Sequence, residues 1–233
     1  MTGVRVKICG LNDAETLGAA IDAGTDMVGF VFYAPSPRHL SHDAARALAR
    51  RVPAGIDKVA LTVDATDEEL AAIVDAVAPD YIQAHGSETP ERIAHVARHF
   101  GVPVIKAIKV SDAADIEAAA AYDGIAHMLL FDARAPEHLD RSLPGGNGVA
   151  FDWSLMNRVP RRTVFMLSGG LDERNVREAI RIARPPIVDV SSGVERAPGR
   201  KDPAAIRRFI AVAKGLELAG DNAGIEAERP TSS

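Results

Sequence analysis

Short runs of apolar, mostly β-branched residues alternate with alanine-rich segments of helical periodicity along most of the chain. The first run, residues 4–8 (VRVKI), is followed by a helical pattern over 14–23, and this order recurs to about residue 216. Runs that are apolar on both faces are typical of strands in a parallel sheet that helices cover on both sides. We interpret eight runs as strands: 4–8, 26–32, 57–63, 80–84, 103–108, 126–131, 163–167 and 187–190.

Helix start signals lie between these runs. A side chain that can cap a helix precedes several of the periodic segments, and in two cases a proline follows it, as is typical of a first helical turn. These signals are Ser41, the capping box Thr66-x-x-Glu69, Thr89–Pro90 and Asp202–Pro203. The predicted helices cover 14–23, 42–51, 66–77, 89–100, 112–121, 152–156, 172–183 and 202–216.

Strands that alternate with helices indicate βαβ units and a parallel sheet. Eight such units favour an α/β fold of one domain, a closed (β/α)8 TIM barrel over residues 1–216. An open, doubly wound sheet is the alternative that periodicity alone leaves open. Residues 217–233 are small and polar, and we expect a disordered tail there.

Composition narrows the class of protein. The 233 residues are 47% hydrophobic, enough for one sizeable core, and the net charge of −5 comes without a basic stripe, which argues against a nucleic-acid partner. No apolar run reaches the roughly 18–20 residues that a membrane helix needs. The single cysteine excludes an internal disulfide, and the N-terminus lacks the apolar segment of a signal peptide, so we expect a cytoplasmic protein.

In a barrel of this kind, chemistry takes place at the carboxyl ends of the strands. Cys9 ends the first strand, where it is either a small buried apolar residue or a general base or nucleophile. Lys7 faces the same way because side chains alternate along a strand. Its ammonium would lower the pKa of the Cys9 thiol, or it forms an ion pair with an inward carboxylate such as Asp189.

Asp132 directly follows the sixth strand. It is either a turn or capping residue or a general acid. An ordinary aspartate, with a pKa of about 3.9, is ionised at neutral pH, so an acid role requires burial or nearby negative charge. A bound anionic substrate would supply part of that charge.

Two glycine turns follow the seventh and eighth strands, at residues 168–170 (SGG) and 191–193 (SSG). Glycines allow a ligand to approach the backbone, and phosphate sites of barrels lie after these two strands. We therefore expect a phosphate site whose residues are Gly169, Gly170, Ser192 and Gly193.

Other polar residues are less specific. Arg38, after the second strand, is either a solvated arginine or a bidentate carboxylate ligand, and His85, after the fourth, either lines the site or stabilises a turn. The spacing of the histidines does not match a metal site, and we expect His95 and His99 to lie on the surface of a helix.

Several stretches together resemble the phosphoribosylanthranilate isomerase family of tryptophan biosynthesis. The resemblance covers about residues 6–209, in matching order and spacing. It rests on KICGL (7–11), GFVFYAPSPRHLS (29–41), QAHG (83–86), PVIKAI (103–108), GGNGVAFDW (145–153), LSGGL (167–171) and VDVSSGVE (188–195) followed by PGRKD (198–202).

The resemblance implies an Amadori rearrangement of N-(5-phosphoribosyl)anthranilate to the 1-deoxyribulose 5-phosphate by general acid and base catalysis. It assigns the acid to Asp132 and the base to Cys9. It further implies that the glycine turns hold the phosphate and that Arg38 holds the anthranilate carboxylate. Lys7, His85 and Asp189 would line the substrate site. It implies no cofactor and no metal, and the substrate is the expected small-molecule partner.

Two other functions remain open. One is the related phosphosugar isomerase of histidine biosynthesis, which has an aspartate on its first strand where this chain has Cys9. The other is a barrel that binds phosphate without catalysis, against which Cys9 and Asp132 together argue. The sequence leaves monomer and homodimer open, and it suggests a lid in the loop between residues 133 and 145.

Overall fold

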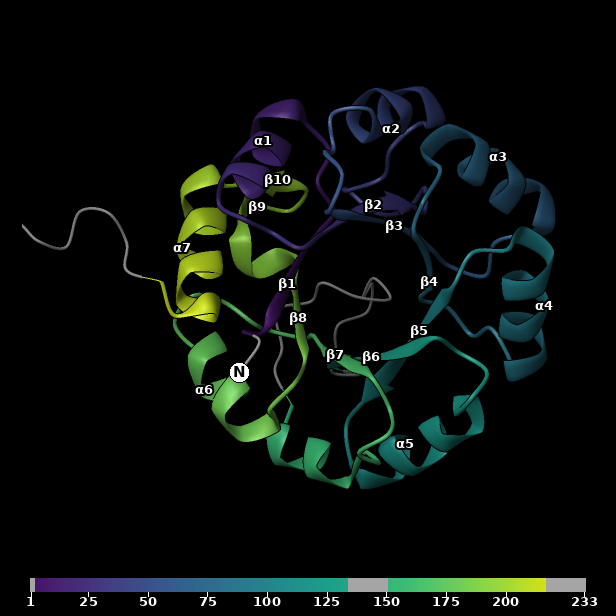
Figure 1. Ribbon diagram of the computed structural model, residues 1–233, viewed down its shortest axis with the longest axis vertical. Helices are drawn as coiled ribbons and strands as arrows, with labels where there is room; N and C mark the ends of the chain where they lie inside the picture. Colours follow the sequence, from purple (N-terminus) through teal and green to yellow (C-terminus); the bar gives the residue numbers. More distant parts are fainter. Residues whose placement is uncertain (1–2, 134–150, 217–233) are drawn as a thin grey trace, which may run out of the picture.

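The computed structural model describes residues 3–133 and 151–216, and these residues form a closed barrel of eight parallel strands surrounded by helices (Figure 1). The strands run in chain order around the barrel. β1 pairs with both β2 and β8, which closes the sheet and confirms the (β/α)8 prediction over the open alternative. The strands are β1 (Arg5–Cys9), β2 (Met27–Phe32), β3 (Asp57–Thr62), β4 (Tyr81–Ala84), β5 (Val104–Val110), β6 (Met128–Ala133), β7 (Phe165–Leu167) and β8 (Ile187–Val190).

The helices form the outer ring (Figure 1). They are α1 (Ala14–Asp22), α2 (His42–Ala49), α3 (Asp67–Val77), α4 (Pro90–Phe100), α5 (Ala113–Ala118), α6 (Val176–Ala183) and α7 (Pro203–Lys214), with the 3-10 helices η1 (Ala119–Tyr122), η2 (Trp153–Arg158) and η3 (Ser192–Val194). The predicted caps are confirmed: the side chains of Ser41, Thr89 and Asp202 accept backbone N–H groups, and Thr66 forms a capping box with Glu69. The helix ends thus follow the local side-chain chemistry that the sequence contains.

Three details differ from the prediction. β6 extends through Asp132, so this residue lies inside the strand rather than after it. α6 begins at Val176 because Asp172, four residues earlier, caps a turn by accepting the amides of residues 174 and 175. A short antiparallel hairpin, β9 (Glu195–Ala197) and β10 (Arg200–Lys201), lies between β8 and α7 and was not expected, because its polar residues lack the alternation of a strand.

The interior of the barrel changes from apolar to polar along the barrel axis. Towards the amino ends of the strands it is a buried apolar cluster that includes three methionines: Met27, Val59, Ile105, Ala107, Met128, Leu130, Met166 and Ile187. Towards the carboxyl ends the side chains that continue the same inward faces are polar and still buried: Lys7, Gln83, Asp132, Ser168 and Asp189. The apolar layer thus forms the floor on which a polar site rests.

The expected tail at 217–233 and the expected lid lie outside the described residues. Within the described ranges, no helix combines the length and the apolar character that crossing a membrane requires.

Candidate active site

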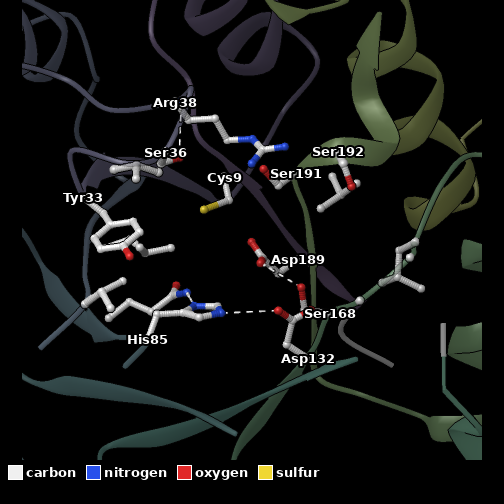
Figure 2. A pocket seen from close by; sticks show the side chains of 18 residues that line it. Cys9, Tyr33, Ser36, Arg38, His85, Asp132, Ser168, Asp189, Ser191 and Ser192 are labelled. Carbon is white, nitrogen blue, oxygen red and sulfur yellow. Dashed lines mark hydrogen bonds and ion pairs between the residues drawn. The ribbon is translucent and has the colours of Figure 1, made fainter. Parts of the chain in front are cut away.

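A pocket of about 650 Å³, counted to its open mouth, lies at the carboxyl ends of the strands (Figure 2). Most of the residues that the sequence predicts for the site line it: Cys9, Arg38, His85, Asp132, Gly169, Gly170, Asp189 and Ser192. Lys7 and Gly193 are not part of the lining. The fold therefore brings eight of the ten predicted residues to one cavity.

Cys9 is the last residue of β1 and points into the pocket, with 4% of its surface exposed (Figure 2). Its partner in the register of β2 is Gly29. A Cβ atom at Gly29 would lie 2.9 Å from the Cys9 sulfur and 3.0 Å from its Cα, closer than side chains pack. The glycine therefore provides the space that the thiol occupies.

The surroundings of Cys9 contradict the sequence-based expectation of a lowered pKa. Burial raises the pKa of the thiol; the Lys7 ammonium lowers it and the Asp189 carboxylate raises it again. Lys201 lowers it further, but the net pKa of Cys9 lies above its ordinary value. In the free protein at neutral pH, Cys9 is therefore a thiol rather than a thiolate.

Lys7 forms a buried ion pair beneath the pocket. Its Nζ donates to Asp189 Oδ1 at 2.8 Å, and the lysine has no exposed surface. Burial lowers the pKa of Lys7, but Asp189 and Cys9 together more than offset this and the pKa is raised overall. Ser168 Oγ donates to the other oxygen of Asp189 at 3.1 Å (Figure 2). Of this pair only Asp189 lines the pocket.

Asp132 faces His85 across the pocket floor. His85 Nε2 lies 3.3 Å from Asp132 Oδ2, and His85 Nδ1 lies 2.8 Å from the amide nitrogen of Gln83. All three residues are buried, with 5% or less of the surface of each exposed. They form a chain of polar contacts from β4 to β6, shown in part in Figure 2.

The segment after β4 that carries His85 is anchored by a second buried ion pair. Lys106, on β5, donates to Glu88 Oε2 at 2.8 Å and to the carbonyl oxygen of Gly86 at 2.7 Å. Glu88 in turn accepts the backbone N–H groups of Gly86 and Asp64. Burial would raise the pKa of Glu88, but Lys106 and these amides lower it below its ordinary value. His85 is thus held in place by a charged anchor outside the pocket lining.

Arg38 is buried rather than solvated. Its Nε and Nη2 donate to the two carboxylate oxygens of Glu195 at 2.7 and 2.8 Å, which is a bidentate pair. Lys201 Nζ also donates to Glu195 at 2.8 Å. Burial lowers the pKa of Lys201 to about 8, against the opposing effect of Glu195. The hairpin therefore occupies one edge of the Arg38 guanidinium, and Nη1 has no hydrogen-bond partner within residues 3–133 and 151–216.

The two glycine turns are packed against their neighbours. Gly169 and Gly170 have φ of 86° and 63°, which favour glycine. A Cβ at Gly169 would lie 2.4 Å from the backbone nitrogen of Ala133, and one at Gly193 would lie 1.9 Å from the carbonyl oxygen of Leu171. Gly193 thus lets the two turns approach each other, and Gly169, Gly170 and Ser192 face the pocket.

Several functional positions were missed from the sequence. Tyr33, Ser36, Gln83, Ser168 and Ser191 also line the pocket. For Gln83 a signal was present: it is a polar residue in a buried strand, two positions before His85 and hence on the same face. His95 and His99 stack on each other on α4, away from this cavity. Among residues 3–133 and 151–216, no cluster of three or more metal-ligating side chains is found.

Comparison with known proteins identifies the family. The sequence profile of N-(5'-phosphoribosyl)anthranilate (PRA) isomerase matches residues 6–212. The N-(5'-phosphoribosyl)anthranilate isomerase of Parvibaculum lavamentivorans is 51% identical over 211 residues, 91% of this chain and 98% of that protein. The one from Rhodopseudomonas palustris (strain CGA009) is 52% identical over 209 residues, 90% and 97% of the two chains.

Solved structures of relatives support the same family. The phosphoribosyl anthranilate isomerase of Thermotoga maritima has a TM-score of 0.81 and 39% identity, over 91% of this chain and all of that one. A structure of the isomerase in complex with reduced 1-(o-carboxyphenylamino)-1-deoxyribulose 5-phosphate has a TM-score of 0.78 and 37% identity, with the same coverage. With this fold, this site and these relatives, the chain belongs to the N-(5'-phosphoribosyl)anthranilate isomerase family.

Proposed function

We propose that this protein converts N-(5-phosphoribosyl)anthranilate to 1-(2-carboxyphenylamino)-1-deoxyribulose 5-phosphate, the Amadori rearrangement of tryptophan biosynthesis. The observation that supports this most is that one pocket holds a buried thiol and a buried carboxylate on separate strands, Cys9 on β1 and Asp132 on β6. An aldose-to-ketose rearrangement needs a proton donor at one atom and a proton acceptor at another.

Each group has one step in this proposal. Asp132 gives a proton to the furanose ring oxygen, the C1′–O bond breaks, and a Schiff base forms between C1′ and the anthranilate nitrogen. Cys9 then removes the proton from C2′, and the resulting enolamine tautomerises to the ketone. Because Cys9 is a thiol in the free protein, its proton passes to solvent at the open mouth of the pocket before it acts as the base. The Lys7 ammonium and the cationic Schiff base both favour the thiolate.

Two parts of the pocket fit the two anionic ends of this substrate. The turns at Gly169, Gly170 and Ser192 present backbone and a hydroxyl to the cavity and suit the phosphate. The Nη1 edge of Arg38, which Glu195 leaves free, suits the anthranilate carboxylate. His85 and Asp189, between these ends, would contact the sugar. We expect the reaction to require no cofactor or metal.

The assembly and location of the protein are part of the proposal. The Thermotoga maritima relative is described as dimeric, and we expect this chain to function as a homodimer or a monomer in the cytoplasm, without a nucleic-acid or membrane partner.

The experiment that tests the function is a loss of anthranilate fluorescence when purified protein is added to phosphoribosylanthranilate. The expected result is a rapid loss that saturates with substrate. The N-phosphoribosyl aminoaldose that the related isomerase of histidine biosynthesis converts serves as the comparison substrate. Conversion of that compound alone would favour the related isomerase, and binding of the reduced product without any turnover would favour a non-catalytic barrel.

A further inference from the structure

Gln83 has a buried side-chain atom that the Gln83–His85–Asp132 contacts leave without a partner among the described residues. Its amide nitrogen contacts His85 Nδ1 at 2.8 Å. Its amide oxygen is buried and has no hydrogen-bond partner among the described residues. A buried polar atom without a partner is costly. Gln83 has no exposed surface, so packing alone does not explain why a glutamine occupies this position.

The orientation of the amide decides where His85 carries its proton. An amide nitrogen only donates, so when it faces Nδ1 that atom must be bare and the proton lies on Nε2. Nε2–H then points at Asp132 Oδ2, 3.3 Å away. In this arrangement Nε2 is a donor and cannot accept a hydrogen bond from a proton held on Asp132.

The opposite orientation of the Gln83 amide reverses the donor and acceptor roles of the His85 ring nitrogens. When the amide oxygen faces Nδ1, it accepts Nδ1–H, and Nε2 becomes an acceptor for a hydrogen bond from a proton that stays on Asp132. The two ends of an amide have nearly the same size, so a half-turn of the amide needs no extra space. It gives the buried oxygen a partner and moves the amide nitrogen to the place that the oxygen leaves. Among the described residues, Gln83 is the polar side chain hydrogen-bonded to Nδ1.

We propose that Gln83 is a positioning residue that sets the tautomer of His85 and thereby decides whether Asp132 holds the proton that the isomerisation uses. This inference rests on the proposed function of Asp132 as the acid. The oxygen of the amide, turned towards Nδ1, is the productive partner. Gln83 itself touches neither the transferred proton nor the ring oxygen that receives it.

Other charged and titratable groups border this chain and are kept unchanged in the test. Those named by the described contacts are Cys9 and Lys7 on β1, Tyr33 and Arg38 after β2, the Lys106–Glu88 pair, Lys109 on β5, which pairs with Asp132 of β6, and Asp189 on β8. Because none of them is altered, a shift that follows substitution of Gln83 is assigned to the amide.

The first measurement is the pH profile of kcat for the wild type, Gln83→Met and Gln83→Glu. Methionine has a similar length but offers no strong acceptor to Nδ1, so we expect a kcat about tenfold to a hundredfold lower at neutral pH. Its basic limb should move to lower pH, with little change in KM. A glutamate carboxylate accepts Nδ1–H at either oxygen, so Gln83→Glu should retain most of kcat and move the basic limb to higher pH.

Tyr81→Phe is the matched control, since Tyr81 lies two residues earlier on the same face of β4 and contacts His127 rather than the site. Its profile should match the wild type. Shifts of equal direction in Gln83→Met and Gln83→Glu, or no shift in either, would overturn the proposal. If Gln83→Met does not fold, the upward shift in Gln83→Glu still decides it.

The second measurement reads the tautomer without turnover. In protein labelled with 15N at histidine and bound to the reduced product, the shifts of the His85 ring nitrogens should show the proton on Nδ1 in the wild type and on Nε2 in Gln83→Met. The same tautomer in both would refute the role of Gln83. If even the wild type failed to turn over phosphoribosylanthranilate, the proposed function would be wrong, while the spectra would still decide whether Gln83 sets the tautomer.

Discussion

The two walls of the pocket are built from different kinds of interaction. The wall around Cys9 is lined by Cys9, Arg38 and Asp189. Buried ion pairs that involve Lys7, Glu195 and Lys201 hold it, with contacts of 2.7 to 2.8 Å. The wall around Asp132, made of Gln83, His85 and Asp132, has a neutral amide and an imidazole, and its contact to the carboxylate is 3.3 Å. We call these the Cys9 wall and the Asp132 wall.

The difference teaches what each wall can do. Fixed charges, once paired in a buried place, set a constant electrostatic environment that is expensive to disturb. An amide and an imidazole can each turn or exchange a proton without unpairing a charge. The Cys9 wall is thus suited to holding geometry, and the Asp132 wall to changing the location of a proton.

Removing the reactive group of either wall, the Cys9 thiol or the Asp132 carboxylate, should have the largest effect on kcat. Positioned proton transfer contributes about 10²- to 10⁴-fold to rate, so Cys9→Ala and Asp132→Asn should each lower kcat by at least that range. Both variants should bind the reduced product and keep the circular dichroism of the wild type. Mass spectrometry locates the modification when Cys9 is alkylated. Full activity of the alkylated protein would show that Cys9 contributes to packing and not to catalysis.

Substitutions that break an ion pair should lower the free energy of unfolding more in the Cys9 wall than substitutions in the Asp132 wall do. Lys7→Met leaves Asp189 buried without its cation, which typically costs about 3–5 kcal/mol of the free energy of unfolding. Urea denaturation measures this loss. Gln83→Met, on the other wall, removes no charge and should cost less. A Lys7→Met variant as stable as Gln83→Met would show that the Lys7–Asp189 pair does not hold the Cys9 wall.

Geometry at the Cys9 wall is tested at Gly29. A methyl group there would lie 2.9 Å from the Cys9 sulfur, so Gly29→Ala should displace the thiol. Misplacement of a reacting group by about 1 Å can cost on the order of 10²-fold, and we expect kcat to fall by about tenfold to a hundredfold. Gly18→Ala, in α1 with open space around it, is the control and should leave kcat unchanged. Equal activity in the two variants would mean that the position of Cys9 is not critical.

The contribution of the Nη1 edge of Arg38 to substrate binding should be seen as a change in KM. Lysine keeps the charge but loses the planar fork, and one charge-assisted hydrogen bond contributes about 1.5–3 kcal/mol. Arg38→Lys should therefore raise KM by about tenfold or more, and Arg38→Ala further. The control is Arg46→Lys, an arginine of α2 that pairs with Asp43 and Asp75 at the surface. An unchanged KM in both Arg38 variants would place the carboxylate elsewhere.

The smallest expected effect is a shift in the pH dependence of alkylation. Only the thiolate reacts with iodoacetamide, and the raised pKa of Cys9 moves thiolate formation to higher pH. Inactivation of the free protein should therefore have a midpoint above the roughly 8.5 of a free thiol. The reduced product should protect Cys9. A midpoint below 8.5 would mean that the Lys7 ammonium outweighs burial.

The barrel was predictable because its signals are local and repeated. Eight apolar runs, with caps such as Ser41 and the Thr66–Glu69 box between them, determine the order of elements, and the rule that chemistry gathers at the carboxyl ends of the strands selects Cys9 and Asp132. The hairpin was not predictable, since its stability comes from contacts that the sequence does not display. Glu195 pairs with Arg38, 157 residues away.

The electrostatics of the site could not be read from the sequence for the same reason. Spacing shows that Lys7 and Cys9 share a face, but the cost of burying the thiol depends on everything packed around it. That cost exceeds the effect of Lys7, and the sign of the pKa shift is reversed. The contact between His85 and Asp132 likewise joins residues that are 47 positions apart.

The Lys7–Asp189 pair has a consequence for how the chain reaches its native state. Lys7 belongs to the first strand and Asp189 to the last, 182 residues later, and β1 and β8 meet where the barrel closes. A ribosome has synthesised most of the protein before the partner of Lys7 exists. Contacts of such long sequence separation form slowly because a large loop must first be closed. The lysine therefore stays hydrated on the growing chain, and its dehydration belongs to the final closure of the barrel.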